Sequence, residues 1–292
     1  MVQLGLNVLF VASQFIIVAL AFGTAYGVQR YFNFSLAFAS TAAAYAYWTF
    51  KQTNIPQLLA FPLAISIGLG WEVFTRQLVF RRLVTRGADA LTCLLASLGL
   101  YVAATESVRI LFGADTKQLK TVIARPFVVL GGTLTETQVA MLCSACLLAC
   151  FCAVVAQYTV AGRVWNAVRQ DSLLSQCFGV DVERVRTVAG AVAGGVLGCA
   201  GILSGMDVGL NPDSGLSLFL IGVAVAITAR LRSVIAIVMC SVCLAVVRES
   251  LTWFLGIGWR DTVLFGLVAF ALAVHSMATS SPSRGAVSQS TL

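Results

Sequence analysis

Residues 161–186 read AGRVWNAVRQDSLLSQCFGVDVERVR, a polar and arginine-rich stretch between two long apolar runs, 138–160 and 188–203. Charged side chains are costly in the hydrocarbon core of a bilayer, so this stretch is expected to lie outside the membrane. Several apolar runs of the chain reach the roughly 20 residues that a helix needs to cross a bilayer. The pattern predicts an all-α protein that is a polytopic transmembrane helical bundle.

The composition indicates the same class. Of the 292 residues, 59% are hydrophobic and only 11% are charged, and the mean hydropathy is +0.91. Soluble domains carry about 25% charged residues. The net charge of +7 could indicate nucleic-acid binding. However, the arginines lie between the apolar runs, which is how membrane proteins distribute positive charge. We therefore expect membrane lipid around the chain and no nucleic-acid partner.

The apolar runs divide the chain into about nine segments, or eight spans if one of the shorter runs is re-entrant. A transmembrane domain is expected over residues 1–277, and the serine-rich tail 278–292 is expected to be disordered. The runs cover residues 4–28, 34–50, 58–75, 90–111, 138–160, 188–203, 216–229, 234–254 and 262–274.

Arginine clusters predict the orientation of the spans. One cluster lies at 76–86, the next at 163–186 two spans later, and a third at Arg230 and Arg232 two spans after that. All three clusters, together with Arg30, are therefore expected on the same side of the membrane. By the positive-inside rule this side is the cytoplasm.

The segment 161–186 has the features of a helix followed by a break. Gly179 suits the position after a helix C-terminus, and Asp181 can cap the helix that continues into the next span. At about 25 residues it is longer than a connection between two spans needs. This favours a helix offered to a partner, although a solvated loop is the alternative. Six residues make an incomplete apolar face that Asp171 interrupts: Val164, Ala167, Val168, Leu174, Cys177 and Phe178.

The sequence lacks the residue patterns of common catalytic and metal sites. The chain contains one histidine, His275, and no phosphate-binding glycine loop of the ATPase type. Most cysteines fall inside apolar runs, where they behave as small apolar residues. We expect no catalytic residue and no metal site. The acidic residues in or near spans, Glu72, Glu106 and Glu249, favour pairing within the structure over a proton relay.

Four motifs, in order, resemble the branched-chain amino acid ABC transporter permeases of the LivH/LivM type, and the LivH type more closely. The first is Asn33-Phe34, and the second runs from Arg76 to Gly87 and continues through 94–115. The third runs from Arg163 to Asp181, and the fourth is Trp259-Arg260-Asp261 followed by TVLFGLVAF. The resemblance extends over nearly the whole chain.

This resemblance implies a membrane permease subunit of an ABC importer in the bacterial inner membrane. The chain would form half of the pathway for an amino acid of the branched-chain type or a similar small polar solute. Its partners would be cytoplasmic ATP-binding subunits that hold ATP and Mg, a second permease subunit and a periplasmic substrate-binding protein. Asn33, Phe34 and Ser35 would line the pathway. Residues 161–186 would contain the coupling helix, with Arg163, Asn166, Ala167, Arg169, Asp171, Phe178 and Gly179 as the residues of the coupling segment.

Two departures from the family pattern affect the expected cargo. Positions 33–37 lack the family's histidine and glycine, and positions 229–233 replace a glycine-rich motif. A permease for urea or short amides is therefore an alternative. An ion-gradient-driven secondary carrier and a membrane scaffold without a pathway are alternatives of other classes.

Overall fold

The computed structural model describes residues 2–53, 55–118, 126–129, 132–229 and 233–255, together with the single positions 262, 263 and 266. Within this part of the chain nearly all regular structure is helical. The helices are α1 (Val2–Gln29), α2 (Ser35–Gln52), α3 (Gln57–Thr75), π-helix η1 (Arg76–Phe80), α4 (Arg81–Thr85), α5 (Ala90–Phe112), α6 (Glu136–Tyr158), α7 (Val160–Gln170), α8 (Ser172–Cys177), α9 (Val182–Val208), α10 (Ser214–Thr228) and α11 (Val234–Leu255).

The all-α polytopic class is confirmed, but the number of spans is not. Six helices of the described residues are long and apolar enough to cross a membrane: α1, α3 with its extension to Thr85, α5, α6, α9 and α11. The second and seventh apolar runs form α2 and the shorter α10. The ninth run, 262–274, and the tail 278–292 lie outside the described residues, apart from positions 262, 263 and 266.

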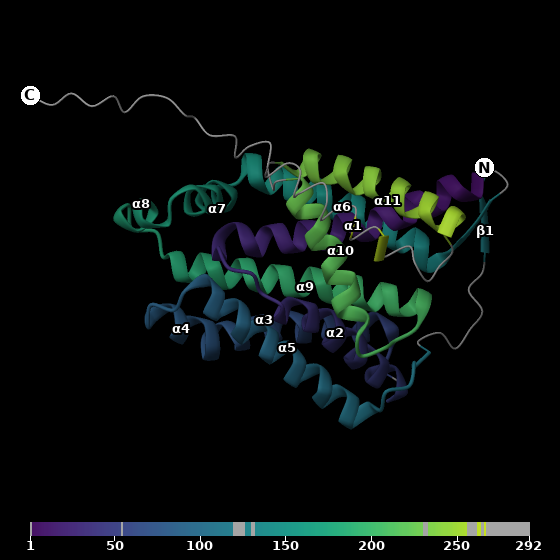
Figure 1. The fold of residues 1–292 in the computed structure, drawn as a ribbon, viewed down its shortest axis with the longest axis horizontal. Helices are drawn as coiled ribbons and strands as arrows, with labels where there is room; N and C mark the ends of the chain where they lie inside the picture. The colour runs from purple at the N-terminus through teal and green to yellow at the C-terminus, as the bar shows by residue number, and fades with distance from the viewer. Residues whose placement is uncertain are drawn as a thin grey trace, which may run out of the picture.

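Helices α1 and α9 run through the middle of the bundle (Figure 1), with α2, α3 and α5 on one side and α6 and α11 on the other. Helix α10 crosses the bundle and packs against α1 and α2. The glycines of α9 allow this close packing. A Cβ added at Gly194 would lie 2.6 Å from the carbonyl oxygen of Gly68 on α3. Small residues at such contacts let the backbones of membrane helices approach each other.

The chain returns into the bundle between α1 and α2 through a non-helical stretch, which we call connection 30–34. It begins at Arg30, whose φ of 61° is unusual for a residue with a side chain. Backbone without helical hydrogen bonds is tolerated at membrane depth only where protein satisfies it. Here Ser97 of α5 does so for one backbone group, because its Oγ accepts from the Phe34 N–H at 3.0 Å while its hydroxyl donates to the Leu94 carbonyl of its own helix at 2.7 Å.

The end of the bundle that carries the N-terminus is closed by short polar contacts. Strands β1 (Pro126–Val129) and β2 (Gly132–Thr135) form an antiparallel hairpin there. Gln3 of α1 pairs with the backbone of Thr133 through both its amide oxygen and nitrogen, at 2.9 and 3.2 Å. Arg109 bridges Glu106 and Asp213 at 2.6 and 2.8 Å, which confirms that Glu106 pairs with Arg109 within α5.

Candidate functional site

The arginine clusters of the described residues gather at the opposite end of the bundle, which we call the Arg-rich end. Helices α4, α7 and α8 and the start of α9 lie together there (Figure 1). The prediction that these clusters share one side is confirmed for the clusters in 76–86 and 163–186 and for Arg30. Arg230 and Arg232 lie outside the described residues.

Helix α7 is fastened to the end of α1. Its Trp165 ring packs against Gly27, where an added Cβ would lie 3.1 Å from the ring, and the indole N–H donates to the Thr24 carbonyl at 3.3 Å. The guanidinium of Arg30 donates to the carbonyls of Arg169 and Gln170 at 2.5 and 3.3 Å. These contacts place a positive charge at the C-terminus of α7, where the helix dipole favours it. This interaction offsets the cost of the unusual backbone conformation of Arg30.

Two further residues of the expected coupling segment hold α7 in place. Asn166 donates to the carbonyl of Ala156 on α6 at 3.3 Å. The guanidinium of Arg169 lies 5.3 Å from the centre of the Trp165 ring. Partial burial and the nearby charge of Arg30 lower the pKa of Arg169 below its usual value. By contrast, Arg163 and Ala167 are exposed.

Helix α8 is a separate short helix that begins and ends at specific residues of the sequence. The Asp171 carboxylate accepts from the N–H groups of Leu173 and Leu174 at 2.9 and 3.0 Å, which caps the helix N-terminus. Gly179 ends the helix with a φ of +82°, a conformation that glycine adopts at little cost. The expected role of Gly179 is thus confirmed, and Asp181 caps α9 by accepting from the Arg184 N–H at 3.1 Å.

The single apolar face expected across 164–178 is wrong. Asp171 has an extended backbone and starts a new helix, so the residues before and after it face different ways. Val168 of α7 is buried with Val28, Val182 and Ala189. On α8 and just after it, Leu173, Leu174 and Phe178 are 73%, 56% and 80% exposed. Leu173 was not among the expected residues, although the capping preference of Asp171 could have revealed the second helix.

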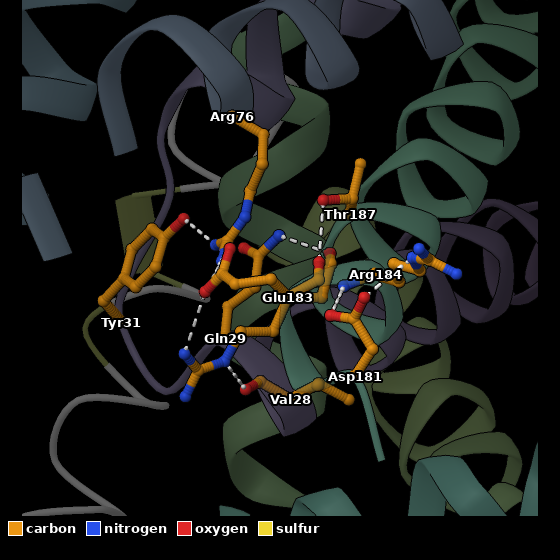
Figure 2. A network of polar contacts seen from close by, with 9 residues as sticks. Val28, Gln29, Tyr31, Arg76, Asp181, Glu183, Arg184 and Thr187 are labelled. Carbon is orange, nitrogen blue, oxygen red and sulfur yellow. Dashed lines mark hydrogen bonds and ion pairs between the residues drawn. The ribbon is translucent and has the colours of Figure 1, made fainter. Parts of the chain in front are cut away.

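Behind α8 lies a network of polar side chains, shown in Figure 2. Arg76 donates through Nη1 to the Tyr31 hydroxyl at 2.9 Å and through Nη2 to both carboxylate oxygens of Glu183, at 2.9 and 3.1 Å. Arg186 also reaches Glu183 at 3.3 Å and donates to the Val28 carbonyl at 3.2 Å. The network therefore joins the ends of α1 and α3 to the first turn of α9.

A second polar cluster lies one helical turn further along α3, at Glu72. This side chain is 2% exposed, and one of its carboxyl oxygens accepts from the Asn33 amide at 3.0 Å. The Ser35 hydroxyl lies between two acceptors, 3.0 Å from the other Glu72 oxygen and 2.7 Å from Asn33 Oδ1. Asn33 in turn accepts from the Ser35 N–H at 3.0 Å. Glu72 is thus paired with donors of connection 30–34 and α2, as expected for a buried acidic residue.

The structure places the three residues predicted to line the pathway inside the protein. Asn33 and Ser35 are 2% and 0% exposed and point to Glu72. The Phe34 ring contacts those of Phe32 and Phe219, with centres 5.6 and 6.0 Å apart. A role in the pathway stays a prediction for these residues. In this conformation their contacts are those of a structural cluster.

A cavity of about 780 Å³ opens beside α7, between α1, α6, α9 and α11. Most of its wall is apolar, with Phe151, Val188 and Ile235 among the lining residues. Polar groups from Thr24, Asn166 and Arg169 lie on the α7 side. Helix α7 is thus held by the end of α6, by α1 and by the start of α9, and the cavity lies between these elements and α11. Among the described residues no cluster of three or more His, Cys, Asp or Glu could hold a metal ion.

These observations define a multi-pass helical membrane protein with an exposed apolar helix at its Arg-rich end. More specifically, the chain belongs to the family described as branched-chain amino acid transport system / permease component, whose model matches residues 4–274. The resemblance noted in the sequence is therefore confirmed, and the chain is a transport permease and not an enzyme. A comparison with curated proteins found no match.

Proposed function

We propose that this permease is the membrane subunit of an ABC importer in the bacterial inner membrane. In this proposal the Arg-rich end faces the cytoplasm, and α8 docks on an ATP-binding subunit that holds ATP and Mg. A second permease subunit supplies the other half of the pathway, and a periplasmic binding protein delivers a branched-chain amino acid. This chain itself binds no cofactor.

The observation that supports the proposal best is the exposed apolar surface of α8 and Phe178. Three large apolar side chains, Leu173, Leu174 and Phe178, are more than half exposed at the Arg-rich end, which the positive-inside rule assigns to the cytoplasm. Exposed apolar clusters rimmed by polar residues mark interaction sites. Capping by Asp171 and the turn at Gly179 fix this surface in one conformation, which suits docking to a rigid partner.

The test is the double substitution Leu173→Asp and Phe178→Asp. It places two charges on the surface that would be buried against the partner, so ATP-binding subunits should no longer copurify with the tagged chain. Uptake of labelled leucine by cells should fall to background. We expect this variant to insert normally, because both side chains point away from the bundle. Arg169 is a poorer target, since its contact with Trp165 means that its substitution disturbs α7 as well.

The matched control is Val208→Asp, at the other end of α9, where the side chain is 74% exposed. It makes the same kind of change and should leave copurification intact. Retained copurification and uptake in the Leu173→Asp, Phe178→Asp variant would contradict the proposal. Leucine uptake by the purified chain in liposomes with only an ion gradient would identify a secondary carrier instead. ATP-dependent uptake of urea or acetamide, but not of leucine, would mean that the transported solute differs from the proposed one. It would not contradict the docking at α8.

A further inference from the structure

We propose that the Arg76–Glu183 ion pair transmits movement of α8 into the membrane-embedded part of the chain, where it acts on the start of α2. This inference rests on the proposed docking of an ATP-binding subunit at α8. It assigns Arg76, Glu183 and Glu72 as residues that position the membrane helices in response to the docked subunit.

The first step leads from α8 to Glu183. Only residues 178–181 separate the end of α8 from the start of α9, and Glu183 lies in the first turn of α9. The connection is stiff rather than loose. The N–H groups of Gly179 and Val180 donate back into α8 at 2.9 and 3.1 Å, and Asp181 caps α9. A displacement of α8 would therefore move the first turn of α9.

The second step crosses from α9 to α3. Arg76 contacts both carboxylate oxygens of Glu183, and its own side chain is only 3% exposed. Both contacts are made by one nitrogen, Nη2, and hydrogen bonds between oppositely charged groups are stronger than those between neutral ones. Because the guanidinium is buried, it cannot exchange Glu183 for water without a large loss of favourable interaction. Helix α3 is therefore expected to follow the first turn of α9.

The third step leads from α3 to α2. Glu72 of α3 and Arg76, the first residue of η1, lie four positions apart in one continuous helical span, and each binds one point of connection 30–34. Arg76 binds Tyr31, and Glu72 binds Asn33 together with Ser35, the first residue of α2. Helix α9 also packs directly against Glu72, because a Cβ at Gly194 would lie 2.7 Å from Glu72 Cγ.

A nearby ion pair provides a matched control. Asp181 and Arg184 pair at 2.7 Å within one turn of α9, and their side chains are 50% and 86% exposed. This pair carries the same charges as Glu183 and Arg76 and lies next to them in the sequence. However, it joins α9 to no other helix, so its removal should not affect transmission.

The experiment measures hydrogen–deuterium exchange of the complex purified with its ATP-binding subunits, with and without ATP and vanadate. In the unsubstituted chain, exchange should change in peptides covering 171–180 and in those covering 30–38. In Arg76→Gln, Glu183→Gln the change at 171–180 should remain. The change at 30–38 should shrink about fivefold or more, at the lower end of known coupling strengths. Asp181→Asn, Arg184→Gln should retain both changes, because asparagine keeps the side-chain oxygen that caps α9 while the ion pair is lost.

An undiminished response at 30–38 in the Arg76→Gln, Glu183→Gln variant would overturn the inference. If that variant does not assemble with its ATP-binding subunits, the exchange pattern of the unsubstituted complex still tests the inference. A response at 30–38 without any response in peptides containing Arg76 and Glu183 would show another route. Absence of any response at 171–180 in the unsubstituted complex would instead refute the proposed docking, and this inference with it.

Discussion

Glu72 shows how one residue can stabilise a non-helical connection inside a bundle of membrane helices. Its carboxyl group lies inside the protein, and its two oxygens accept from side chains that begin α2. Asn33 also accepts from the Ser35 N–H, one of the backbone donors that the first turn of a helix leaves without a helical partner. The cluster therefore satisfies a buried acidic group and the start of α2 together.

Substitution of Ser35 by alanine tests this role. The buried oxygens of Asn33 and Glu72 would both lose the Ser35 hydroxyl, and an unsatisfied buried polar group costs about 1–3 kcal/mol. We expect a lower midpoint of thermal unfolding for the chain purified in detergent. Ser66→Ala is the control, because Ser66 is exposed on α3 and its hydroxyl bonds only to Leu63 of the same helix. Equal midpoints for the two variants would argue against a structural role of the cluster.

The sequence pointed to Asn33 and Ser35, but for a different reason from the one the structure provides. Their family motif suggested contact with the pathway, whereas in the structure they contact Glu72, 39 and 37 positions away. Such a pairing depends on the return of connection 30–34 into the bundle. No local pattern in the sequence encodes this return, because the run 34–50 is equally consistent with an ordinary span.

At the scale of single elements, apolar length predicts the long helices well. The bilayer imposes this length directly, so α1, α3, α5, α6 and α11 begin and end close to their apolar runs, whereas α9, Val182–Val208, extends beyond both ends of the run 188–203. The division of 160–177 into α7 and α8 was missed. Asp171 caps a new helix, and the capping preference of aspartate was the available signal. The division was missed because an aspartate is equally compatible with the polar surface of one continuous helix.

Two adjacent glycines of α9 give a sharp test of its packing. A Cβ at Gly194 would lie 2.6 Å from the Gly68 carbonyl oxygen, so α3 and α9 would have to separate. At Gly195 the nearest atom would be 3.6 Å away, an ordinary contact. We expect Gly194→Ala to destabilise the chain by about 1–3 kcal/mol through overpacking. Gly195→Ala should be neutral or stabilising by up to about 1 kcal/mol, because alanine favours helix.

The measurement is the thermal unfolding midpoint of both variants in the same detergent. It separates packing from helix propensity, since both substitutions add one methyl group to the same helix at neighbouring positions. Equal effects of the two would mean that α3 and α9 are not in close contact in the membrane.

At the scale of the whole molecule the two ends of the bundle differ in charge and in how they are closed. The Arg-rich end presents α7, α8 and the arginines around them, while the other end has a hairpin and compact ion pairs. This asymmetry follows from the arginine clusters in the sequence, so the relative orientation of the helices was predictable. The partner at α8 was not predictable from these residues, because exposed apolar side chains indicate a contact but do not identify the protein that makes it.

Labelling of Cys177 tests this orientation. Cys177 is exposed at the end of α8, and a membrane-impermeant maleimide should modify it in inside-out vesicles but not in right-side-out vesicles. Cysteines within the spans should react little, because lipid disfavours the thiolate that attacks the reagent. Cys177→Ser should therefore remove most of the signal. In that background Val208→Cys, at the other end of α9, should react only in right-side-out vesicles.

The same reagent also separates orientation from docking. If an ATP-binding subunit covers α8, Cys177 should be shielded in freshly prepared inside-out vesicles and become reactive after urea strips peripheral subunits from the membrane. A constant rate of modification before and after stripping would mean that α8 is uncovered in the cell, even if its side of the membrane is correct. Modification of Cys177 in right-side-out vesicles would reverse the orientation and place the apolar surface of α8 outside the cell, where no ATP-binding subunit could reach it.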